Sequence, residues 1–387
     1  MSTRFDVVVI GGGIQGVGVA QAAAVCGYSV LLLEQESLAS GTSSRSSKLI
    51  HGGLRYLESR QLGLVRESLR ERETLLKIAP SLVERKAFYI PVYGHSRRSP
   101  SRITAGLLLY RALAQGAHGG FQRVAPRHWD TLDGLKTAGL KAVFRYCDDQ
   151  TDDAALTRAV AQSAQDFGAE LRIGARFIGA ERVGPRYEVR FLTAGSVASC
   201  SAQVLVNATG PWVGQTLGRI LPGPPRLAHD LVQGAHIITP GTLRQGIYYT
   251  EAPRDGRAVF VMPWHGRILT GTTETAYIGD PAFSAATQDE IIYLQEVLTS
   301  YFPDLSPTVE ESFAGLRVLP RAAHGFSARA REAVLLADGP VPRLISIFGG
   351  KLTGYRCTAD RVMKRFRGVL PDRIARGDTQ RLILPVP

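Results

Sequence analysis

A strand, a glycine-rich turn, a helix and a second strand at the start of the chain limit its fold more than any other feature. Residues 5–10 are an apolar run of the kind found in buried parallel strands. The glycine pattern G-x-G-x-x-G follows at residues 11–16, and residues 14–26 have the small side chains of a closely packed helix. Residues 29–33 form the second strand, and Glu34 closes it. This βαβ order predicts an α/β fold with a Rossmann-like domain that binds a dinucleotide.

Each part of such a unit has a physical task. Gly11 permits the tight turn, Gly13 lets a pyrophosphate approach the backbone, and Gly16 lets the helix pack on the strand. The pyrophosphate is expected at the helix N-terminus, where free N–H groups and the helix dipole favour an anion. Glu34 can accept hydrogen bonds from the adenosine ribose. The predicted nucleotide contacts are Gly11, Gly13, Ile14, Gln15, Gly16 and Glu34.

A polar segment follows this unit almost directly. Residues 41–57 contain a hydroxyl-rich turn, basic residues, a histidine, a glycine pair and an Arg-Tyr pair. Most of these side chains require water or a polar ligand, so the segment is poor core material. We expect it to lie beside the reactive end of the bound cofactor.

Composition narrows the class of protein. The 387 residues suffice for a large core and two domains. The sequence contains no apolar window of the roughly 18 residues that a transmembrane helix needs, and no signal-peptide pattern, so a cytoplasmic protein is expected. The four cysteines form no C-x-x-C pair, which predicts reduced thiols and no metal site.

The net charge of +12 favours an anionic partner. A phosphorylated substrate, an acidic membrane surface or nucleic acid would suit it, but we find no nucleic-acid-binding module and expect no nucleic acid. Basic residues 97–102 precede an apolar helical pattern over residues 103–114. That helix would either dock on its own domain or lie in a membrane interface.

The rest of the chain predicts a return to the first sheet. Residues 202–210 form a buried strand whose end, Thr209 and Gly210, would pass close to the cofactor. Residues 230–340 alternate as in an antiparallel sheet over the cofactor, and residues 344–353 form a strand, a glycine turn and a helix start. We expect a discontinuous cofactor domain (residues 1–80, 145–225 and 340–387) and a substrate domain (residues 81–144 and 226–339).

The late glycine turn indicates which dinucleotide is bound. Gly349 and Gly350 are predicted to open a helix directly, and a helix N-terminus aimed at a flavin pyrimidine ring would stabilise its negative charge after reduction. A NAD enzyme needs no such late return to the first sheet. The pattern therefore favours FAD.

Several motifs together resemble the FAD-dependent glycerol-3-phosphate dehydrogenases, the quinone-linked flavoproteins within the glycine-oxidase and D-amino-acid-oxidase fold group. The resemblance runs from about residue 5 to about residue 365. The motifs are Gly11 to Gly16, Thr42-Ser43-Ser44, residues 46–58, residues 207–213, Gly271-Thr272-Thr273, Gly315-Leu316-Arg317 and residues 348–353.

The resemblance implies oxidation of sn-glycerol 3-phosphate to dihydroxyacetone phosphate. The C2 hydride would pass to N5 of FAD, and the electrons would leave to quinone or another acceptor. Compared with many relatives, the chain would be a short form without the C-terminal helical domain. A cytoplasmic protein free of the membrane and one that lies peripherally on the inner face of the cell membrane are both open alternatives, and so is a homodimer.

The site residues carry over from matching motifs. The implied substrate contacts are Arg55, Tyr56, Thr273, Arg317, Arg331 and Lys351, with Arg317 and Arg331 on the phosphate, where forked guanidinium groups suit a dianion. A proton acceptor is also needed, so the implied catalytic residues are Arg317 and two candidate bases, His51 and His236. The further FAD contacts are Thr42, Ser43, Ser44, Ser47, Lys48, Leu49, His51, Gly52, Gly53, Thr209, Gly210, Gly349, Gly350, Lys351, Leu352 and Thr353.

Departures from the family pattern leave alternatives open. Glu274 replaces a usual Asp, Val318 stands where Pro is common, and Gly354 replaces a hydroxyl residue. Another polyol phosphate or a small hydroxy acid is therefore an alternative substrate. An amino-acid oxidase on the same fold would need a carboxylate clamp and an apolar pocket. The basic charge alone suggests a non-catalytic or nucleic-acid-modifying flavoprotein.

Overall fold

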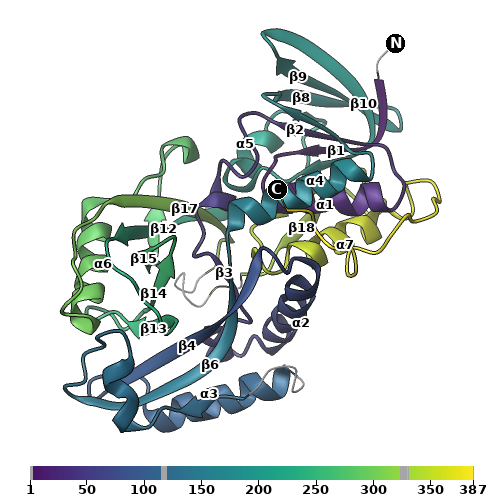
Figure 1. Cartoon of the computed structure of the whole chain (residues 1–387). Helices are drawn as coiled ribbons and strands as arrows, with labels where there is room; N and C mark the ends of the chain where they lie inside the picture. Colours follow the sequence, from purple (N-terminus) through teal and green to yellow (C-terminus); the bar gives the residue numbers. More distant parts are fainter. Residues whose placement is uncertain (1–2, 115–119, 323–328, 330, 387) are drawn as a thin grey trace.

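The first apolar run forms strand β1 (Thr3–Ile10), which pairs in parallel with β2 (Val30–Glu34) and with β10 (Ser196–Asn207). Strand β19 (Leu344–Phe348) pairs in parallel with the carboxyl end of β10. Three segments that are far apart in the sequence therefore end at the same edge of one sheet (Figure 1). The computed structural model describes residues 3–114, 120–322, 329 and 331–386.

Helices cover one face of this sheet. Helix α1 (Ile14–Val25) packs between α4 (Asp153–Asp166) and α7 (Tyr355–Phe366), and their apolar side chains form one core with β1 and β10. A short helix, α5 (Val213–Leu217), contributes to the core on the other face. The remaining strands are β7 (Glu170–Ile173), β8 (Arg176–Val183), β9 (Arg186–Thr193), β11 (Ile220–Leu221) and β18 (Val334–Ala337).

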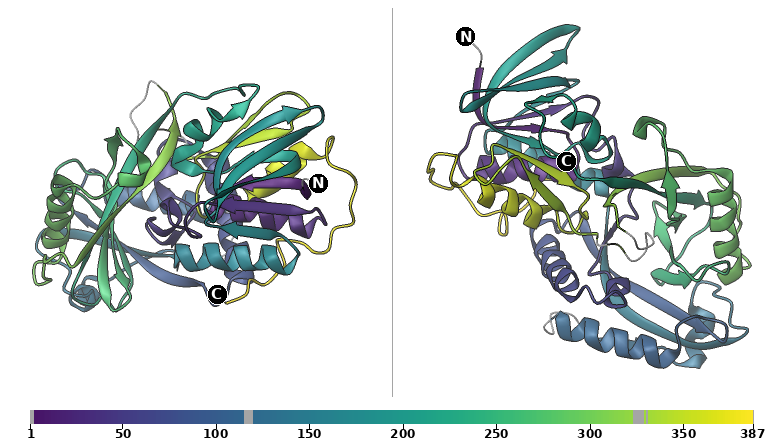
Figure 2. Two further views of the ribbon diagram at one scale, coloured as in Figure 1. Left: turned by 90° about the horizontal axis from the view of Figure 1, so that it is seen from above. Right: turned by 180° about the vertical axis from the view of Figure 1, so that it is seen from behind.

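The second sheet lies beside the first, as the view from above in Figure 2 shows. Its strands are β3 (Leu49–Ile50), β4 (Val83–Tyr93), β5 (Gln122–Arg123), β6 (Leu140–Thr151), β12 (His229–Thr239), β13 (Ile247–Glu251), β14 (Ala258–Trp264), β15 (Arg267–Gly271), β16 (Thr275–Tyr277) and β17 (Glu311–Pro320). The pairing is antiparallel except between β13 and β4, which run parallel. The expectation of an antiparallel sheet is thus correct for most of it.

Two cores hold this second sheet. Helices α2 (Leu62–Ile78) and α3 (Pro100–Leu113) pack on one face, and α6 (Gln288–Tyr301) packs on the other. Helix α3 begins with Ser99, whose hydroxyl accepts the Arg102 N–H, and with a proline at its first position, which needs no N–H donor. Its inner face contributes Ile103, Leu107 and Tyr110 to the core.

The strand pairing bears on where the two expected domains meet. The boundary at residue 145 falls inside β6, which pairs with β4 along almost its whole length. Strand β18, expected in the substrate domain, pairs with β19 of the first sheet. Because backbone hydrogen bonds across a sheet hold these strands, we propose that β6 belongs to the second unit and β18 to the first.

Among the described residues, none of the helices combines the length and the apolar character that crossing a bilayer requires.

We predict that Gly16→Ala destabilises the protein by about 1–3 kcal/mol, because a Cβ there would lie 1.9 Å from the Gly11 carbonyl oxygen. Gly106→Ala in α3 is the control. Apart from its chain neighbours and the adjoining helix backbone, no atom of the described residues lies within 4 Å of its added Cβ, so the better helix former should stabilise by about 0.5–1 kcal/mol. Thermal unfolding of both variants measures the difference, and equal melting temperatures would refute the packing argument.

Candidate active site

The turn between β1 and α1 is prepared for an anion at the helix N-terminus. The side chain of Glu34 lies at this turn, and its Oε2 accepts the Gly12 N–H at 2.7 Å. The Ser43 hydroxyl accepts the Ile14 N–H at 2.9 Å, so the hydroxyl-rich segment reaches the first turn of α1. Glycine residues, free N–H groups and an acid at the end of β2 together fit the pyrophosphate and ribose of a dinucleotide.

The late glycine turn lies against the same place. Gln15 donates from Nε2 to the Lys351 carbonyl at 3.3 Å, and a Cβ on Gly350 would lie 2.7 Å from that nitrogen. The His51 N–H points at the Thr353 hydroxyl at 3.3 Å. The buried Oε1 of Gln15 has no hydrogen-bond partner in the described part of the chain. A cofactor that spans these segments would supply a hydrogen-bond donor for this side-chain oxygen of Gln15.

One detail of this turn differs from the expectation. Gly349 and Gly350 do not open the helix directly, because α7 begins only at Tyr355, with Gly354 as its N-cap. Both glycines have positive φ angles, 70° and 98°, and turn the chain before the helix starts. The end of the helix dipole therefore lies at residues 354–355 rather than at the glycines.

The hydroxyl-rich segment is fixed mainly by contacts within the protein. The Thr42 hydroxyl donates to the Leu316 carbonyl at 2.8 Å. Lys48, expected to contact the cofactor, is buried and forms an ion pair with Asp153 at 2.7 Å. Its ammonium group also donates to the Ser44 carbonyl. Because the charge of Lys48 already has a buried carboxylate, this side chain holds the segment to α4 in the structure.

The two candidate bases differ in position. His51 lines a cavity, and burial, together with the charge of Lys351 and of other basic groups, lowers the pKa of His51 to about 3. His236 is buried outside the cavity lining, stacked on Phe313. Its Nε2 lies 3.0 Å from the hydroxyl of Ser47, which does line the cavity. Only His51 therefore faces a ligand directly, whereas His236 is one hydroxyl removed.

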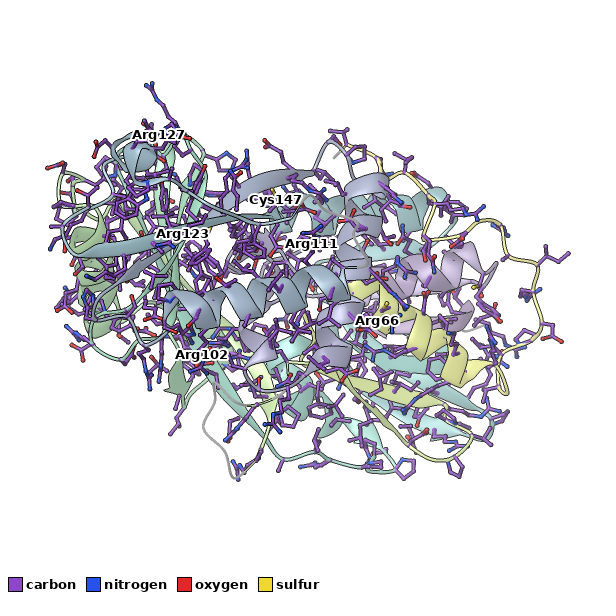
Figure 3. The ribbon with its side chains drawn as sticks, turned by 90° about the horizontal axis from the view of Figure 1, so that it is seen from below. Arg66, Arg102, Arg111, Arg123, Arg127 and Cys147 are labelled. Atoms are coloured by element: carbon purple, nitrogen blue, oxygen red, sulfur yellow. The ribbon has the colours of Figure 1, made fainter. Side chains whose placement is uncertain are left out.

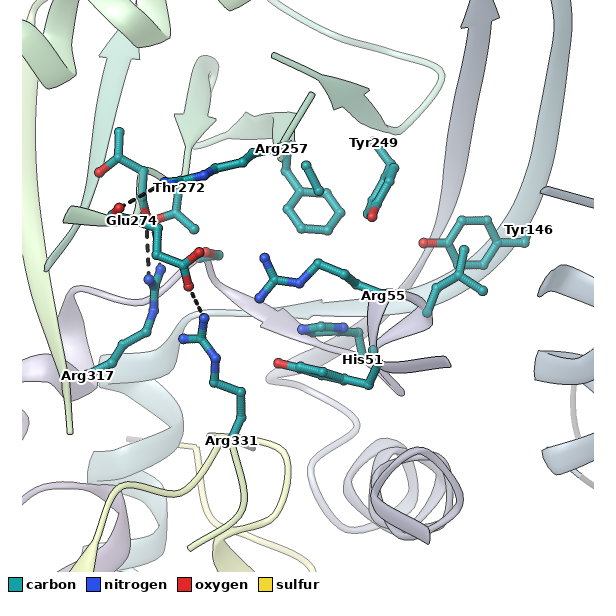
Figure 4. A pocket seen from close by; sticks show the side chains of 16 residues that line it. His51, Arg55, Tyr146, Tyr249, Arg257, Thr272, Glu274, Arg317 and Arg331 are labelled. Carbon is teal, nitrogen blue, oxygen red and sulfur yellow. Dashed lines mark hydrogen bonds and ion pairs between the residues drawn. The ribbon is translucent and has the colours of Figure 1, made fainter. Parts of the chain in front are cut away.

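The cavity lies against strands of the second sheet, is about 150 Å³ in volume and brings most of the expected substrate residues together (Figure 4). Basic and aromatic side chains dominate its wall. Those predicted from the sequence are Ser47, His51, Gly53, Arg55, Tyr56, Thr273, Glu274, Arg317 and Arg331, and those not predicted include Tyr146, Tyr249, Arg257, Phe260 and Thr272.

Positive charge exceeds negative charge in this cavity. Arg317 donates to the Thr272 hydroxyl at 2.9 Å and to the Thr273 carbonyl at 3.4 Å. Burial and the charge of Arg331 lower the pKa of Arg317 to about 10. Arg331 forms an ion pair with Glu274, and its buried Nε has no hydrogen-bond partner among the described residues. Four arginines face one carboxylate here, so the cavity suits a dianion.

Lys351 lies at the edge of the cavity rather than in its wall. Its ammonium group is 3.9 Å from the centroid of the Tyr56 ring and 3.2 Å from the Ser68 hydroxyl. Burial and the charge of Arg331 lower its pKa to about 7. An anion in the cavity would relieve this repulsion between basic groups.

Three further residues that are expected to contact the cofactor lie in short strands or in turns that follow strands. Leu49 belongs to β3, and the Gly52 N–H donates to the Tyr110 hydroxyl at 2.9 Å, which holds the loop beside His51. The Thr209 hydroxyl donates to Asn207 at 2.7 Å after β10. Among the described residues, no group of three or more His, Cys, Asp or Glu side chains is arranged to hold a metal ion.

The unpredicted cavity residues had a weak signal in the sequence. Tyr249 and Phe260 are paired across β13 and β14, and Ala258 lines the cavity from the same face of β14 as Phe260. The alternation of apolar and polar side chains in these strands is visible in the sequence. Which face of the strands meets the ligand depends on how the second sheet lies against the first sheet. Arg257, just before β14, could have been listed only as one of many arginines.

The fold and the cavity together define a dinucleotide-binding protein with a cationic ligand pocket. Residues 6–356 match the family model described as DAO, FAD dependent oxidoreductase. The chain therefore belongs to this family of FAD-dependent oxidoreductases. It is 39% identical over 377 residues to a glycerol-3-phosphate dehydrogenase of Pseudomonas aeruginosa, an alignment that covers 94% of this chain and 72% of that protein.

Two further relatives bear on substrate and cofactor. A D-erythritol 1-phosphate dehydrogenase of Brucella abortus is 36% identical over 387 residues, covering 95% of this chain and 74% of that protein. The solved structure of the glycerol-3-phosphate dehydrogenase from Bacillus halodurans complexed with FAD has a TM-score of 0.76 and 28% identity. The match covers 98% of this chain and 68% of that chain. The expected fold class and the expected cofactor, FAD, are thus confirmed.

We predict that Lys351→Met makes the flavin-free protein more stable near pH 7. The pKa of Lys351 is about 7 in the folded chain and ordinarily 10.5, so between these values the unfolded state binds more protons. The stability of the parent protein should therefore rise with pH across this window, and the advantage of the variant should shrink toward pH 10.5. Melting temperatures at several pH values test this, and a constant difference would contradict it.

Proposed function

We propose that this chain oxidises sn-glycerol 3-phosphate to dihydroxyacetone phosphate with FAD as its cofactor. The observation that carries the proposal is the cavity in which four arginines face one carboxylate, next to the turns that fit a dinucleotide. The names of the relatives, a glycerol-3-phosphate dehydrogenase among them, support a phosphorylated alcohol as substrate. Bound FAD would accept the hydride from the alcohol carbon and pass the electrons on, which we propose is to a quinone.

The phosphate would bind at Arg317 and Arg331. Their guanidinium groups can form paired hydrogen bonds to a phosphate, and the unpartnered Nε of Arg331 supplies a further donor. Glu274 would orient Arg331 while leaving the cavity with excess positive charge. Binding a dianion among buried, mutually repelling cations is favourable because it replaces repulsion by attraction at low dielectric.

Arg55, Tyr56 and Lys351 would orient the hydroxyl groups. Arg55 has no hydrogen-bond or ion-pair partner among the described residues, so its donors remain for a ligand. Lys351 reaches the same region over the Tyr56 ring. Together they would hold the carbinol group while the protein excludes water from the buried cavity.

His51 is our choice for the group that takes the hydroxyl proton. It lines the cavity and is neutral because its pKa is low, so a ring nitrogen can accept a proton. A bound phosphate dianion would counter the positive charges of Lys351 and Arg55 that lower this pKa. His51 would then become a stronger base once substrate is present.

At the nucleotide end, the α1 N-terminus with Gly13 and Ser43 would hold the pyrophosphate of FAD, and Glu34 the ribose. The segments around Gly52 and Thr353 would contact the ring end. These assignments follow from the contacts between the three segments described above.

A longer polyol phosphate is a second candidate substrate. The relative from Brucella abortus is named for erythritol 1-phosphate, a four-carbon alcohol. In the described part of the chain, the cavity hydroxyls of Tyr146 and Tyr249 have no hydrogen-bond partner and could receive an additional hydroxyl group. An amino-acid substrate is less favoured, because its single carboxylate would leave most of the arginine charge unpaired.

Anaerobic mixing of the flavin-loaded protein with glycerol 3-phosphate, followed at the flavin absorbance band, tests the function. We expect rapid bleaching, and Arg317→Ala should retain FAD but lose about 100-fold or more in the second-order rate constant of reduction, because a buried phosphate would lose a charged partner. Arg267→Ala, which removes an exposed ion pair with Glu311, is the control. Bleaching by erythritol 1-phosphate alone, or by an amino acid alone, would overturn the proposed substrate.

We further propose that the outer face of α3 rests on the inner, cytoplasmic face of the membrane. Leu108 and Leu109 are 53% and 40% exposed on this face, beside Arg102 and Arg111. Figure 3 shows these arginines and also Arg66, Arg123 and Arg127 on the same side of the molecule. Exposed leucines next to basic residues are typical of helices that lie in an anionic interface.

We predict that the protein cosediments with vesicles of phosphatidylcholine and phosphatidylglycerol and that salt weakens this binding. Leu108→Asp should reduce binding by about tenfold, because it removes an apolar contact and adds repulsion from anionic lipid. Val197→Asp, at a 65% exposed valine on the first sheet, is the control. Equal binding of both variants would exclude α3 as the contact.

A further inference from the structure

Arg317 lies against two backbone segments of the second sheet. Its guanidinium group donates to the Thr272 hydroxyl and to the Thr273 carbonyl. Gly234 of β12 lies beside this contact, because a Cβ there would come within 2.3 Å of Arg317 Nη2 and 2.5 Å of the Thr272 hydroxyl oxygen. The position of the guanidinium group therefore depends on how these two segments are placed relative to each other.

The carboxylate of Glu290 in α6 joins the two segments from behind the cavity. Its Oε2 accepts the side-chain amide of Gln233 at 2.7 Å, next to Gly234. Its Oε1 accepts the hydroxyl groups of Thr273 at 2.7 Å and Thr275 at 2.9 Å. Glu290 is only 5% exposed and does not line the cavity, so it can act on a ligand only through these neighbours.

The role of Glu290 as a helix cap does not explain these contacts. Glu290 and Thr287 form a capping box, in which Glu290 Oε2 accepts the Thr287 N–H at 3.1 Å and the Thr287 hydroxyl accepts the Glu290 N–H. A capping box requires only these reciprocal bonds. Three additional donors come from the segments around Arg317. Burial acts to raise the pKa of Glu290, but the hydrogen bonds from Thr273 and the other donors outweigh burial and lower it.

The hydrogen bond between Thr273 and Glu290 also affects the position of Arg331, the second phosphate-binding arginine of the cavity. The Thr273 hydroxyl, which donates to Glu290, also accepts the Ala235 N–H at 2.8 Å. Its O–H donor and one of its two lone pairs are therefore used within the protein, and a direct contact of Thr273 with the substrate stays a prediction. Glu274 follows Thr273 directly and pairs with Arg331, so fixing Thr273 also restrains this ion pair.

We propose that Glu290 is a positioning residue for the phosphate-binding arginines: through Gln233 and Thr273 it fixes Arg317, and through the Thr273–Glu274 segment it fixes Arg331. It would thereby set the affinity for the phosphorylated end of the substrate. The proposal rests on the proposed function in assuming that the ligand of these arginines is a phosphate ester.

Glu290→Gln tests the proposal with almost no change of volume. In either orientation of the amide, the new NH₂ group cannot accept the donors on one side, which are Gln233 and the Thr287 N–H or the hydroxyls of Thr273 and Thr275. One side of the support is therefore lost or has to rearrange. We expect the dissociation constant of glycerol 3-phosphate, obtained from anaerobic flavin reduction, to rise about tenfold, which equals about 1.4 kcal/mol. The rate constant at saturation should change less than about twofold, because His51 and the FAD turns are not touched.

The matched control is Asp133→Asn. Asp133 is also a multiply bonded carboxylate of the second unit, and accepts the N–H groups of Arg244 at 2.9 Å and Gln245 at 3.0 Å and the Tyr248 hydroxyl at 2.9 Å. It contacts none of the cavity residues. We expect it to lower the melting temperature without changing the dissociation constant. Equal losses of affinity in both variants, or no loss in Glu290→Gln, would overturn the proposal.

Two further measurements keep the test decisive. If Glu290→Gln does not fold, Thr275→Val replaces it as the test. It removes one donor to Glu290 and should raise the dissociation constant of glycerol 3-phosphate about threefold.

Inorganic phosphate should raise the melting temperature of the flavin-loaded protein, less in Glu290→Gln than in Asp133→Asn. If glycerol 3-phosphate fails to reduce the parent protein, the proposed function fails, but this phosphate effect still supports the role of Glu290. Equal phosphate effects in both variants, or none in the parent protein, would refute it.

Discussion

The close approach of backbones at the carboxyl end of the first sheet is the constraint on which the rest of the structure depends. A Cβ at Gly11 would lie 2.7 Å from the Ala208 carbonyl oxygen, and one at Gly16 even closer to that of Gly11. Because these positions carry no side chain, β1, α1 and the end of β10 can meet at one point. Gly350 brings the third segment to Gln15 in the same way. The nucleotide-binding turns exist only because these backbones can approach one another.

Electrostatics then decides what the second unit can bind. The cavity wall collects four arginines that are buried or half-buried, and Glu274 is the carboxylate among its lining residues. Keeping such groups charged away from water costs free energy, which a dianionic ligand would return. Two other buried cations are each paired with a buried carboxylate, Lys48 with Asp153 and Arg356 with Glu71. The contrast marks the cavity as a ligand site rather than as part of the structural core.

Local patterns were sufficient for the elements that have strong signals of their own. The first βαβ unit, the return of β10 and the late strand β19 were all predicted, because apolar runs bounded by glycines are local features. The basic residues of the cavity came from motifs that the resemblance supplied, and the structure does place Arg55, Arg317 and Arg331 together. The ion pair between Lys48 and Asp153 was not predicted, because the two residues are 105 positions apart and no local pattern reveals the pair. The contact of Lys48 with the cofactor stays a prediction.

The sequence by itself determined the nucleotide-binding unit, the family and the identity of most cationic groups, since these depend on short-range patterns of residue types. Only the tertiary structure decided which histidine faces the cavity, which strands β6 and β18 pair with, and that Tyr146, Tyr249 and Arg257 complete the wall. These features depend on how two sheets with separate cores are placed against each other. Such placement results from many weak packing contacts between distant segments, and no single stretch of residues encodes it.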